Sequence, residues 1–132
     1  MQILIADNSP QVRFALRVAL EQRPGMKTIG DAIDAEDLLA QAKVIRPNLV
    51  LLDSDLPGMP LADLIAQLHQ TCIDVHMIIL SSHSEDREQA VAALADAFVC
   101  KCDAPDGLLS AIDDCFKEES PVDDKQLGQA RL

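Results

Sequence analysis

The segment LVLLDSDLPGMP, residues 49–60, runs four consecutive aliphatic residues into Asp53, and a Pro-Gly turn follows a second acid at Asp55. A run that is apolar at every position is typical of a strand that helices cover on both faces. Burying a carboxylate at the end of such a strand is costly unless the group is paired. Asp53 is therefore a candidate functional residue.

Working outward from this segment, β-rich runs alternate with amphipathic segments five times along the chain. The predicted strands are QILIA (2–6), KTIGDA (27–32), LVLLD (49–53), VHMIIL (75–80) and AFVCK (97–101). Ser and Asp cap free N–H groups and Pro suits the start of a helix, and such signals follow each strand, at Ser9-Pro10, Asp34, Met59-Pro60, Ser84 and Ala104-Pro105. Strict alternation with short loops predicts a three-layer α/β fold, with a parallel sheet between two layers of helices.

Polar residues stand at the ends of four of the predicted strands. The first strand ends at Asp7 and Asn8, the third at Asp53, the fourth at Ser81 and the fifth at Lys101. In a flavodoxin-like sheet of order 2-1-3-4-5, the first and third strands are neighbours, and ligands bind beyond the carboxyl ends of the strands. We therefore expect one crevice lined by carboxylates, a hydroxyl and an ammonium group.

That combination of groups favours phosphoryl transfer. Neighbouring carboxylates raise each other's pKa unless a cation neutralises them, and Mg²⁺ prefers oxygen ligands from carboxylates, carbonyls and water. Phosphoryl transfer then needs an in-line nucleophile and cations that hold the spread negative charge. Asp53 fits the nucleophile and would form an acyl phosphate, while Lys101 and Ser81 would each hold a phosphoryl oxygen.

On these residues the chain resembles the receiver domains of bacterial two-component response regulators, in particular those that precede a helix-turn-helix output module. The phrases that carry the resemblance are IADNSPQVRFALRVAL, RPNLVLLDSDLPGM, IILSSHS and PDGLLSAI. The resemblance covers residues 1–118, and we expect residues 119–132 to be a polar tail or linker. It implies a phosphoacceptor that assists its own phosphotransfer and dephosphorylation rather than an enzyme.

The resemblance implies a role for each matching residue. Asp53 accepts a phosphoryl group from a sensor histidine kinase, and Lys101 contacts that group. Mg²⁺ is held by Asp7, Asn8, Asp53 and the backbone carbonyl of Asp55. Ser81 and Phe98 form a switch that remodels the face made by the fourth helix, the fifth strand and the fifth helix. Asp55 and His83 stand two residues beyond Asp53 and Ser81, where they would modulate hydrolysis of the phosphoryl group.

The first predicted helix carries a candidate partner surface. Its buried stripe has helical spacing, whereas Phe14 and Val18 lie four apart on the opposite side. Receivers of the family dock this helix on the kinase, so the pair is the expected docking surface. The family also forms homodimers, through the first and fifth helices or through the face of the fourth helix, and no residue here selects between them.

Two positions depart from the family pattern. The family usually has a second acid where this chain has Asn8, which predicts weaker Mg²⁺ binding because one formal charge is lost. The family usually has a glycine where this chain has Leu94. Glycine there lets a helix end in a left-handed turn, so we expect the fourth helix to run on and end differently.

Composition limits the remaining classes of function. The chain has 132 residues and a formal net charge of -11, so it should repel nucleic acid, and any DNA binding would belong to a fused or partner output domain. No segment approaches the ~20 apolar residues of a membrane span, and the start MQILIADNS lacks the features of a signal peptide, which predicts a cytoplasmic protein. In that compartment the four cysteines should stay reduced, with those near the fifth strand as inward apolar thiols.

Two other functions compete with the phosphoacceptor. A pseudo-receiver would share the fold and act as an interaction module without phosphorylation, which Asn8 and Leu94 favour and the remaining site residues oppose. The Asp-x-Asp of residues 53–55 also suits haloacid-dehalogenase-type phosphatases. In those enzymes the motif normally follows the first strand, whereas here it follows the third.

Overall fold

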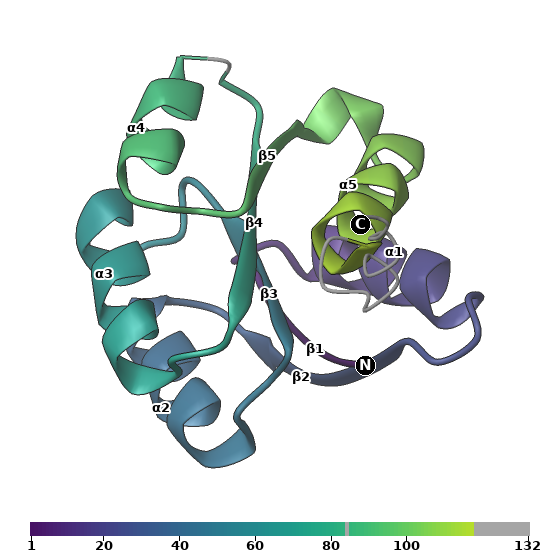
Figure 1. Cartoon of the computed structure of the whole chain (residues 1–132), viewed down its shortest axis with the longest axis horizontal. Helices are drawn as coiled ribbons and strands as arrows, with labels where there is room; N and C mark the ends of the chain where they lie inside the picture. The colour runs from purple at the N-terminus through teal and green to yellow at the C-terminus, as the bar shows by residue number, and fades with distance from the viewer. Residues whose placement is uncertain (84, 118–132) are drawn as a thin grey trace, which may run out of the picture.

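The computed structural model, which describes residues 1–83 and 85–117, is a chain of alternating strands and helices (Figure 1). The strands are β1 (Gln2–Ala6), β2 (Lys27–Ala32), β3 (Leu49–Asp53), β4 (His76–Ser81) and β5 (Ala97–Cys100). The helices are α1 (Pro10–Glu21), α2 (Ala35–Ile45), α3 (Leu61–Thr71), α4 (Asp86–Ala92) and α5 (Asp106–Lys117), with the 3-10 turn η1 (Lys101–Asp103) between β5 and α5. The predicted strands are confirmed to within a residue or so at their ends.

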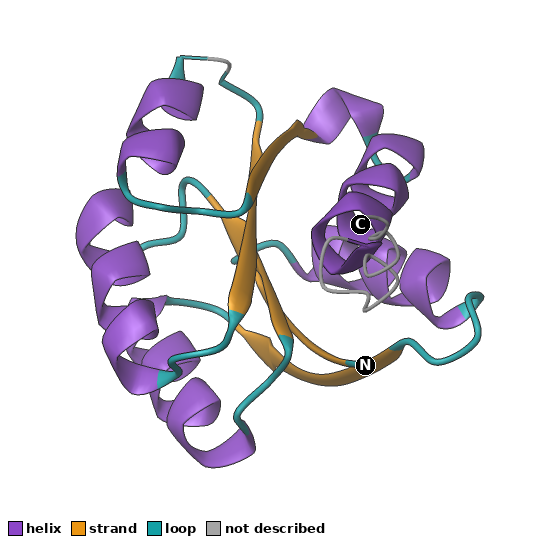
Figure 2. Cartoon of the chain, viewed as in Figure 1, coloured by secondary structure: helices purple, strands orange, loops and turns teal. Residues whose placement is uncertain are grey.

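The five strands form one parallel sheet in the order β2-β1-β3-β4-β5, as predicted. Helices α2, α3 and α4 cover one face, and α1 and α5 cover the other (Figure 2). Strand β3 lies in the middle of the sheet and is buried throughout. Its Val50 and Leu52 join the core under α2, α3 and α4, whereas Leu49 and Leu51 join the core under α1 and α5. Burial on both faces explains its unbroken apolar run.

Helix starts follow the predicted caps in part. Ser9 accepts a hydrogen bond from the Val12 amide and Asp34 accepts one from the Asp37 amide. Helix α3 begins at Leu61 with Pro60 as its cap, one residue later than predicted. The predicted start at Ser84 and the predicted tail, residues 119–132, lie outside the described residues.

No helix in the described part of the chain has both the length and the apolar character that crossing a bilayer requires.

Helix α4 ends in a left-handed turn in spite of Leu94, so the expectation that it would run on was wrong. Leu94 has φ +71°. Its amide donates to Val91 O at 3.0 Å, and the Ala95 amide donates to Ala90 O at 3.1 Å. Those paired bonds satisfy the last carbonyls of the helix, as in a Schellman cap. The cap forms because its two hydrogen bonds outweigh the free-energy cost of placing Leu94 in the left-handed region. The Leu94 residue is 72% exposed.

The cysteines also differ from the expectation. A disulfide joins Cys100 and Cys102, and Cys102 is exposed, so the prediction of inward, reduced thiols at the end of β5 was wrong. The strand ends at Cys100, and η1 turns the next residues away from the sheet. Cys72 is a buried free thiol, in agreement with the predicted reduced state.

Replacing Leu94 with glycine should stabilise the protein. A non-glycine residue in the left-handed region costs about 1 kcal/mol or more, and the exposed side chain contributes little packing. We expect Leu94→Gly to raise the free energy of unfolding in urea by about 1 kcal/mol. Ala92→Gly is the control: it places the same residue in right-handed helix and should lower stability by about 1 kcal/mol. Equal or lower stability of Leu94→Gly would show that the turn is not strained.

Candidate functional site

One lysine bridges two buried carboxylates at the carboxyl edge of the sheet. The Lys101 Nζ atom lies 3.1 Å from Asp7 Oδ2 and 3.0 Å from Asp53 Oδ1. Asp7 is 2% exposed and Asp53 is 6% exposed. The strands that end here are β1, β3 and β5, so the three side chains meet because the strand order brings those ends together. The predicted meeting of Asp7, Asp53 and Lys101 is therefore found.

Local hydrogen bonds hold both the backbone and the side chain of Asp7. The Asp7 amide donates to Ala32 O of β2 at 3.0 Å, and Asp7 Oδ1 accepts from the Ser9 amide at 2.9 Å. Arg13 of α1 donates from Nη1 to the Asp7 carbonyl at 2.6 Å. The start of α1 therefore holds the end of β1, and sequence patterning did not indicate this role for Arg13.

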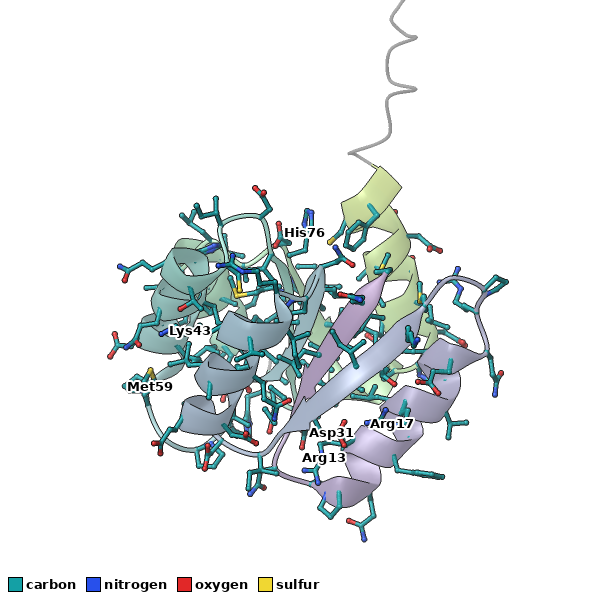
Figure 3. The ribbon with its side chains drawn as sticks, turned by 90° about the horizontal axis from the view of Figure 1, so that it is seen from below. Arg13, Arg17, Asp31, Lys43, Met59 and His76 are labelled. Atoms are coloured by element: carbon teal, nitrogen blue, oxygen red, sulfur yellow. A yellow bond between two sulfur atoms is a disulfide. The ribbon has the colours of Figure 1, made fainter. Side chains whose placement is uncertain are left out.

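Arg13 is itself held by an ion cluster between α1 and β2. Its Nε lies 3.5 Å from Asp31 Oδ2, and Arg17 Nη2 contacts Asp31 Oδ1. Figure 3 shows Arg13 and Arg17 pointing from α1 toward Asp31 on the neighbouring strand. The cluster fixes α1 against β2 beside the site.

Burial sets the charge balance of the site. It is the main cause that raises the pKa of Asp53; the negative charge of Asp7 adds to the rise and contacts with Lys101 oppose it. Burial acts to lower the pKa of Lys101, but hydrogen bonds to Asp53 and Asp7 outweigh it, and the pKa lies above its ordinary value. The folded chain thus holds a proton on Asp53 more tightly than the unfolded chain. Ionising that carboxyl therefore costs stability as the pH rises through its raised pKa.

The donor set of the site suits a hard cation. Asp7 and Asp53 supply carboxylate oxygens, and the Asp55 amide donates to Asp53 Oδ1 at 3.3 Å, which places the residue 55 backbone next to that carboxylate. Asn8 follows Asp7 directly and is exposed. Carboxylate, carbonyl and side-chain amide oxygens are ligands of the kind that Mg²⁺ takes. A divalent cation would also relieve the repulsion that raises the Asp53 pKa, so the residues fit the predicted metal.

The predicted switch residues lie on neighbouring strands and on the same face of the sheet. Ile79 of β4 pairs with Phe98 of β5, and both pack in the core under α2, α3 and α4. Ser81 stands two residues beyond Ile79 and so shares that face. Phe98 is half-buried, and the Arg87 guanidinium of α4 lies 4.9 Å from the centre of its ring.

Ser81 connects the strand end to α4. Its side chain is buried, with 1% of the residue exposed, and its Oγ lies 2.9 Å from Asp86 Oδ2, at the first residue of α4. The same oxygen accepts a hydrogen bond from the His83 amide at 2.8 Å. The sequence did not indicate a partner for Ser81 on α4.

The two predicted modulating residues face each other above the site. His83 Nε2 lies 3.4 Å from Asp55 Oδ2, and both side chains are at least half exposed. The loops after β3 and β4 thus meet over the Asp53 end of the sheet.

The predicted docking residues are exposed, as expected. Phe14 is 68% exposed and Val18 is 44% exposed, both on α1.

Comparison with known proteins agrees with the fold. A family model for the response regulator receiver domain matches residues 3–113. The nitrate/nitrite response regulator protein NarP of Escherichia coli K12 is 31% identical over 113 residues, which cover 84% of this chain and 53% of NarP. NarL of the same strain is 28% identical over 112 residues, which cover 83% of this chain and 52% of NarL. The chain thus spans about half the length of the curated relatives that it matches.

A similar structure has been solved for a two-component response regulator of the LuxR family from Aurantimonas sp. SI85-9A1. It superposes with a TM-score of 0.82 at 27% identity, covering 89% of this chain and 85% of that one. The signal receiver domain of the putative response regulator NarL from Mycobacterium tuberculosis superposes with a TM-score of 0.80 at 25% identity, covering 88% and 95%. With its five-stranded parallel sheet, its acid pair bridged by a lysine and these likenesses, the chain belongs to the response regulator receiver domain family.

Proposed function

We propose that this receiver domain is a phosphoacceptor that takes a phosphoryl group on Asp53 from a sensor histidine kinase in a Mg²⁺-dependent reaction. The observation that carries the proposal is the buried Asp53 carboxylate in contact with Lys101 and beside Asp7. A carboxylate in that position is a nucleophile with a fixed cation next to it. The domain is consumed and regenerated in each cycle, so it acts as a signalling protein rather than as an enzyme on other substrates.

Lys101 prepares Asp53 for the transfer. It donates to Asp53 Oδ1 at 3.0 Å and so holds one carboxylate oxygen, leaving the other as the nucleophile. In the transfer, a carboxylate oxygen forms a bond to phosphorus while the bond from phosphorus to the donor's histidine nitrogen breaks, and the nitrogen keeps the electron pair. Lys101 then supplies positive charge to the phosphoryl oxygens. Mg²⁺, held by Asp7, Asn8, Asp53 and the Asp55 carbonyl, would neutralise further charge on those oxygens.

The new charge on Asp53 reaches α4 through Ser81. A hydrogen bond from Ser81 Oγ to a phosphoryl oxygen competes with its contact to Asp86 Oδ2 at 2.9 Å. Release of that contact frees the start of α4, and Phe98, which packs under Arg87 of the same helix, follows. The α4–β5–α5 face is the expected output surface. Asp55 and His83 meet above the site and are proposed to modulate hydrolysis of the phosphoryl group.

The relatives suggest how the domain is used. NarL and NarP are response regulators about twice as long as the matched region, and the LuxR-family likeness includes a DNA-binding response regulator from Staphylococcus aureus. We therefore propose a DNA-binding output domain, fused or separate, under the control of this receiver in the cytoplasm. The net charge of -11 argues against DNA contact by the receiver itself.

The first prediction of this function concerns the acceptor residue. Incubation of the full chain with acetyl phosphate and Mg²⁺ should add one phosphoryl mass that hydroxylamine removes, since an acyl phosphate is labile to that reagent. Intact-protein mass should show the adduct in wild type and none in Asp53→Asn. Asp63→Asn, which changes an exposed acid on α3, is the matched control and should be labelled to the same extent as wild type. No adduct at any Mg²⁺ concentration would favour the interaction module that works without phosphorylation.

A second prediction concerns Asn8. An acid at position 8 would place another negative charge near the cation. The added electrostatic attraction is on the order of a few kcal/mol at ~4 Å and an effective dielectric of ~20. Asn8→Asp should therefore lower the Mg²⁺ concentration for half-maximal labelling by about tenfold or more. Asn48→Asp adds the same charge at the opposite edge of the sheet, where Asn48 Oδ1 accepts from the Gln2 amide. Titrations of Asn8→Asp and wild type that coincide would remove Asn8 from the metal site.

A third prediction concerns the kinase. Phe14 and Val18 form the proposed docking surface, and burying this exposed apolar pair should stabilise the complex. Replacing both with Glu should slow phosphoryl transfer from the cognate kinase by about tenfold or more, while labelling by acetyl phosphate stays unchanged. The control replaces Val44 and Ile73 with Glu, two apolar residues elsewhere that are more exposed than the docking pair. Unchanged transfer in the Phe14 and Val18 variant would place the docking surface elsewhere.

A further inference from the structure

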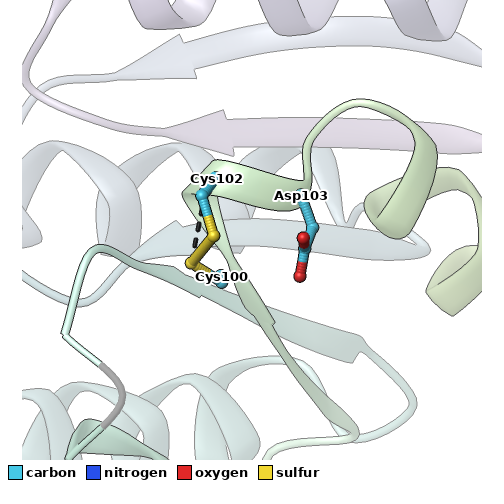
Figure 4. A group of neighbouring side chains, drawn as sticks. All are labelled: Cys100, Cys102 and Asp103. Carbon is cyan, nitrogen blue, oxygen red and sulfur yellow. Dashed lines mark hydrogen bonds between the residues drawn. A yellow bond between two sulfur atoms is a disulfide. The ribbon is translucent and has the colours of Figure 1, made fainter.

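Two cysteines flank the lysine of the site and are joined to each other. Cys100 is the last residue of β5, Cys102 lies in η1, and Lys101 stands between them. The Cα atoms of the two cysteines are 5.2 Å apart, within the range that disulfides span. Figure 4 shows both sulfur atoms on one side of the turn. Cys100 is half-buried and Cys102 is exposed, so reagents in solution can reach the pair.

The turn itself brings the sulfur atoms together. The Cys102 amide donates to Cys100 Sγ at 3.3 Å, so the Cys100 side chain caps the start of η1. The Ala104 amide donates to Lys101 O at 3.3 Å and closes the same turn. Bond formation therefore needs little rearrangement of the backbone, which favours intramolecular closure.

The pair is poorly suited to a purely structural role. A disulfide between residues two apart closes a very short loop and removes little entropy from the unfolded chain. Exposed disulfides are also the ones that exchange readily with other thiols. Cys72 provides the contrast within the chain: it is buried, its Sγ donates to Ala42 O, and burial raises the pKa of its thiol, so little reactive thiolate forms.

The position of the pair ties its state to Lys101. Lys101 stands between the two bonded cysteines, and its ammonium group contacts Asp7 and Asp53. On the α1 side, Lys101 borders a largely apolar cavity of about 380 Å³, lined also by Val12, Leu16 and Pro105. An apolar cavity holds no partner for the ammonium group, so the backbone of η1 and the two acids determine where Lys101 lies.

We propose that Cys100 and Cys102 are a thiol–disulfide exchange site, oxidised by a small-molecule disulfide such as oxidised glutathione, whose closure holds Lys101 against Asp7 and Asp53. One cysteine thiolate attacks a glutathione sulfur and releases one glutathione thiolate. The second cysteine attacks the mixed disulfide, forms the Cys100–Cys102 bond and releases the second. The cysteines lose two electrons and two protons, and both glutathione molecules leave as thiols. Only the consequence for phosphorylation rests on the proposed function.

A metal site is the competing interpretation of the same residues. Both sulfur atoms and a carboxylate oxygen of Asp103 lie within 4.8 Å of one another. Thiolates with a carboxylate can bind Zn²⁺. The joined sulfur atoms favour exchange, and zinc binding is an outcome that the experiment distinguishes.

The first measurement follows the thiols. The full chain is equilibrated at fixed pH over a series of reduced-to-oxidised glutathione ratios, with a chelator present, then acid-quenched, alkylated and mapped by mass spectrometry. We expect Cys100 and Cys102 to lose alkylation together, with a loss of two hydrogens, while Cys72 stays a thiol. Cys102→Ser should stop at a mixed disulfide on Cys100, and Cys115→Ser, the matched control, should behave as wild type.

Two results of that measurement would overturn the exchange site. One is independent alkylation of the two cysteines at every ratio. The other is the absence of a disulfide together with stoichiometric zinc uptake by the reduced, chelator-free chain that Cys102→Ser abolishes, which would assign the residues to a metal site.

The second measurement follows Lys101 without reference to phosphorylation. A short pulse of an amine-acetylating ester is applied to the oxidised and reduced forms, and labelling is mapped at each lysine. Acetylation of Lys101 should be several-fold slower in the disulfide form, whereas exposed Lys27 should react equally in both. Equal acetylation rates at Lys101 in the two forms would contradict the proposal that the disulfide holds Lys101 in place. Acetyl phosphate labelling of both forms is then compared, and its failure in both would count against the proposed function alone.

Discussion

Two carboxylates buried side by side at the end of a parallel sheet need a cation, and the rest of the site depends on that need. The strand order makes Asp7 and Asp53 neighbours, and burial together with their mutual repulsion raises the Asp53 pKa. Lys101 meets both acids from the end of β5. Contacts with Lys101 oppose the rise in the Asp53 pKa, and hydrogen bonds to the two acids raise the pKa of Lys101.

The site is connected to its surroundings through short, specific contacts. Arg13 joins the end of β1 to α1, and Ser81 joins the end of β4 to Asp86 of α4. Both contacts involve polar groups that are buried or partly buried, where hydrogen bonds are strong and costly to leave unmade. The Cys100–Cys102 pair adds a covalent connection next to Lys101.

Much of the fold and of the central site could be predicted because periodicity and strand ends are local features of a sequence. The unbroken apolar run before Asp53 predicted a central strand, and β3 is buried on both faces. The predictions failed where two local preferences compete. Leu94 disfavours a left-handed turn, yet two capping hydrogen bonds impose one. Cys102 looked like an inward apolar residue, but β5 ends two residues earlier and the turn exposes it.

The sequence by itself determined the elements, their parallel arrangement and the identity of the acids, hydroxyl and lysine at the strand ends, because hydrophobic period and capping chemistry act over a few residues. Only the tertiary structure decided which of these side chains touch. The 3.0 Å contact between Lys101 and Asp53 joins residues far apart in the chain. The link from Arg13 to Asp31 likewise depends on how α1 packs against β2. Such contacts are set by the balance of burial and pairing across the whole domain, which no local pattern encodes.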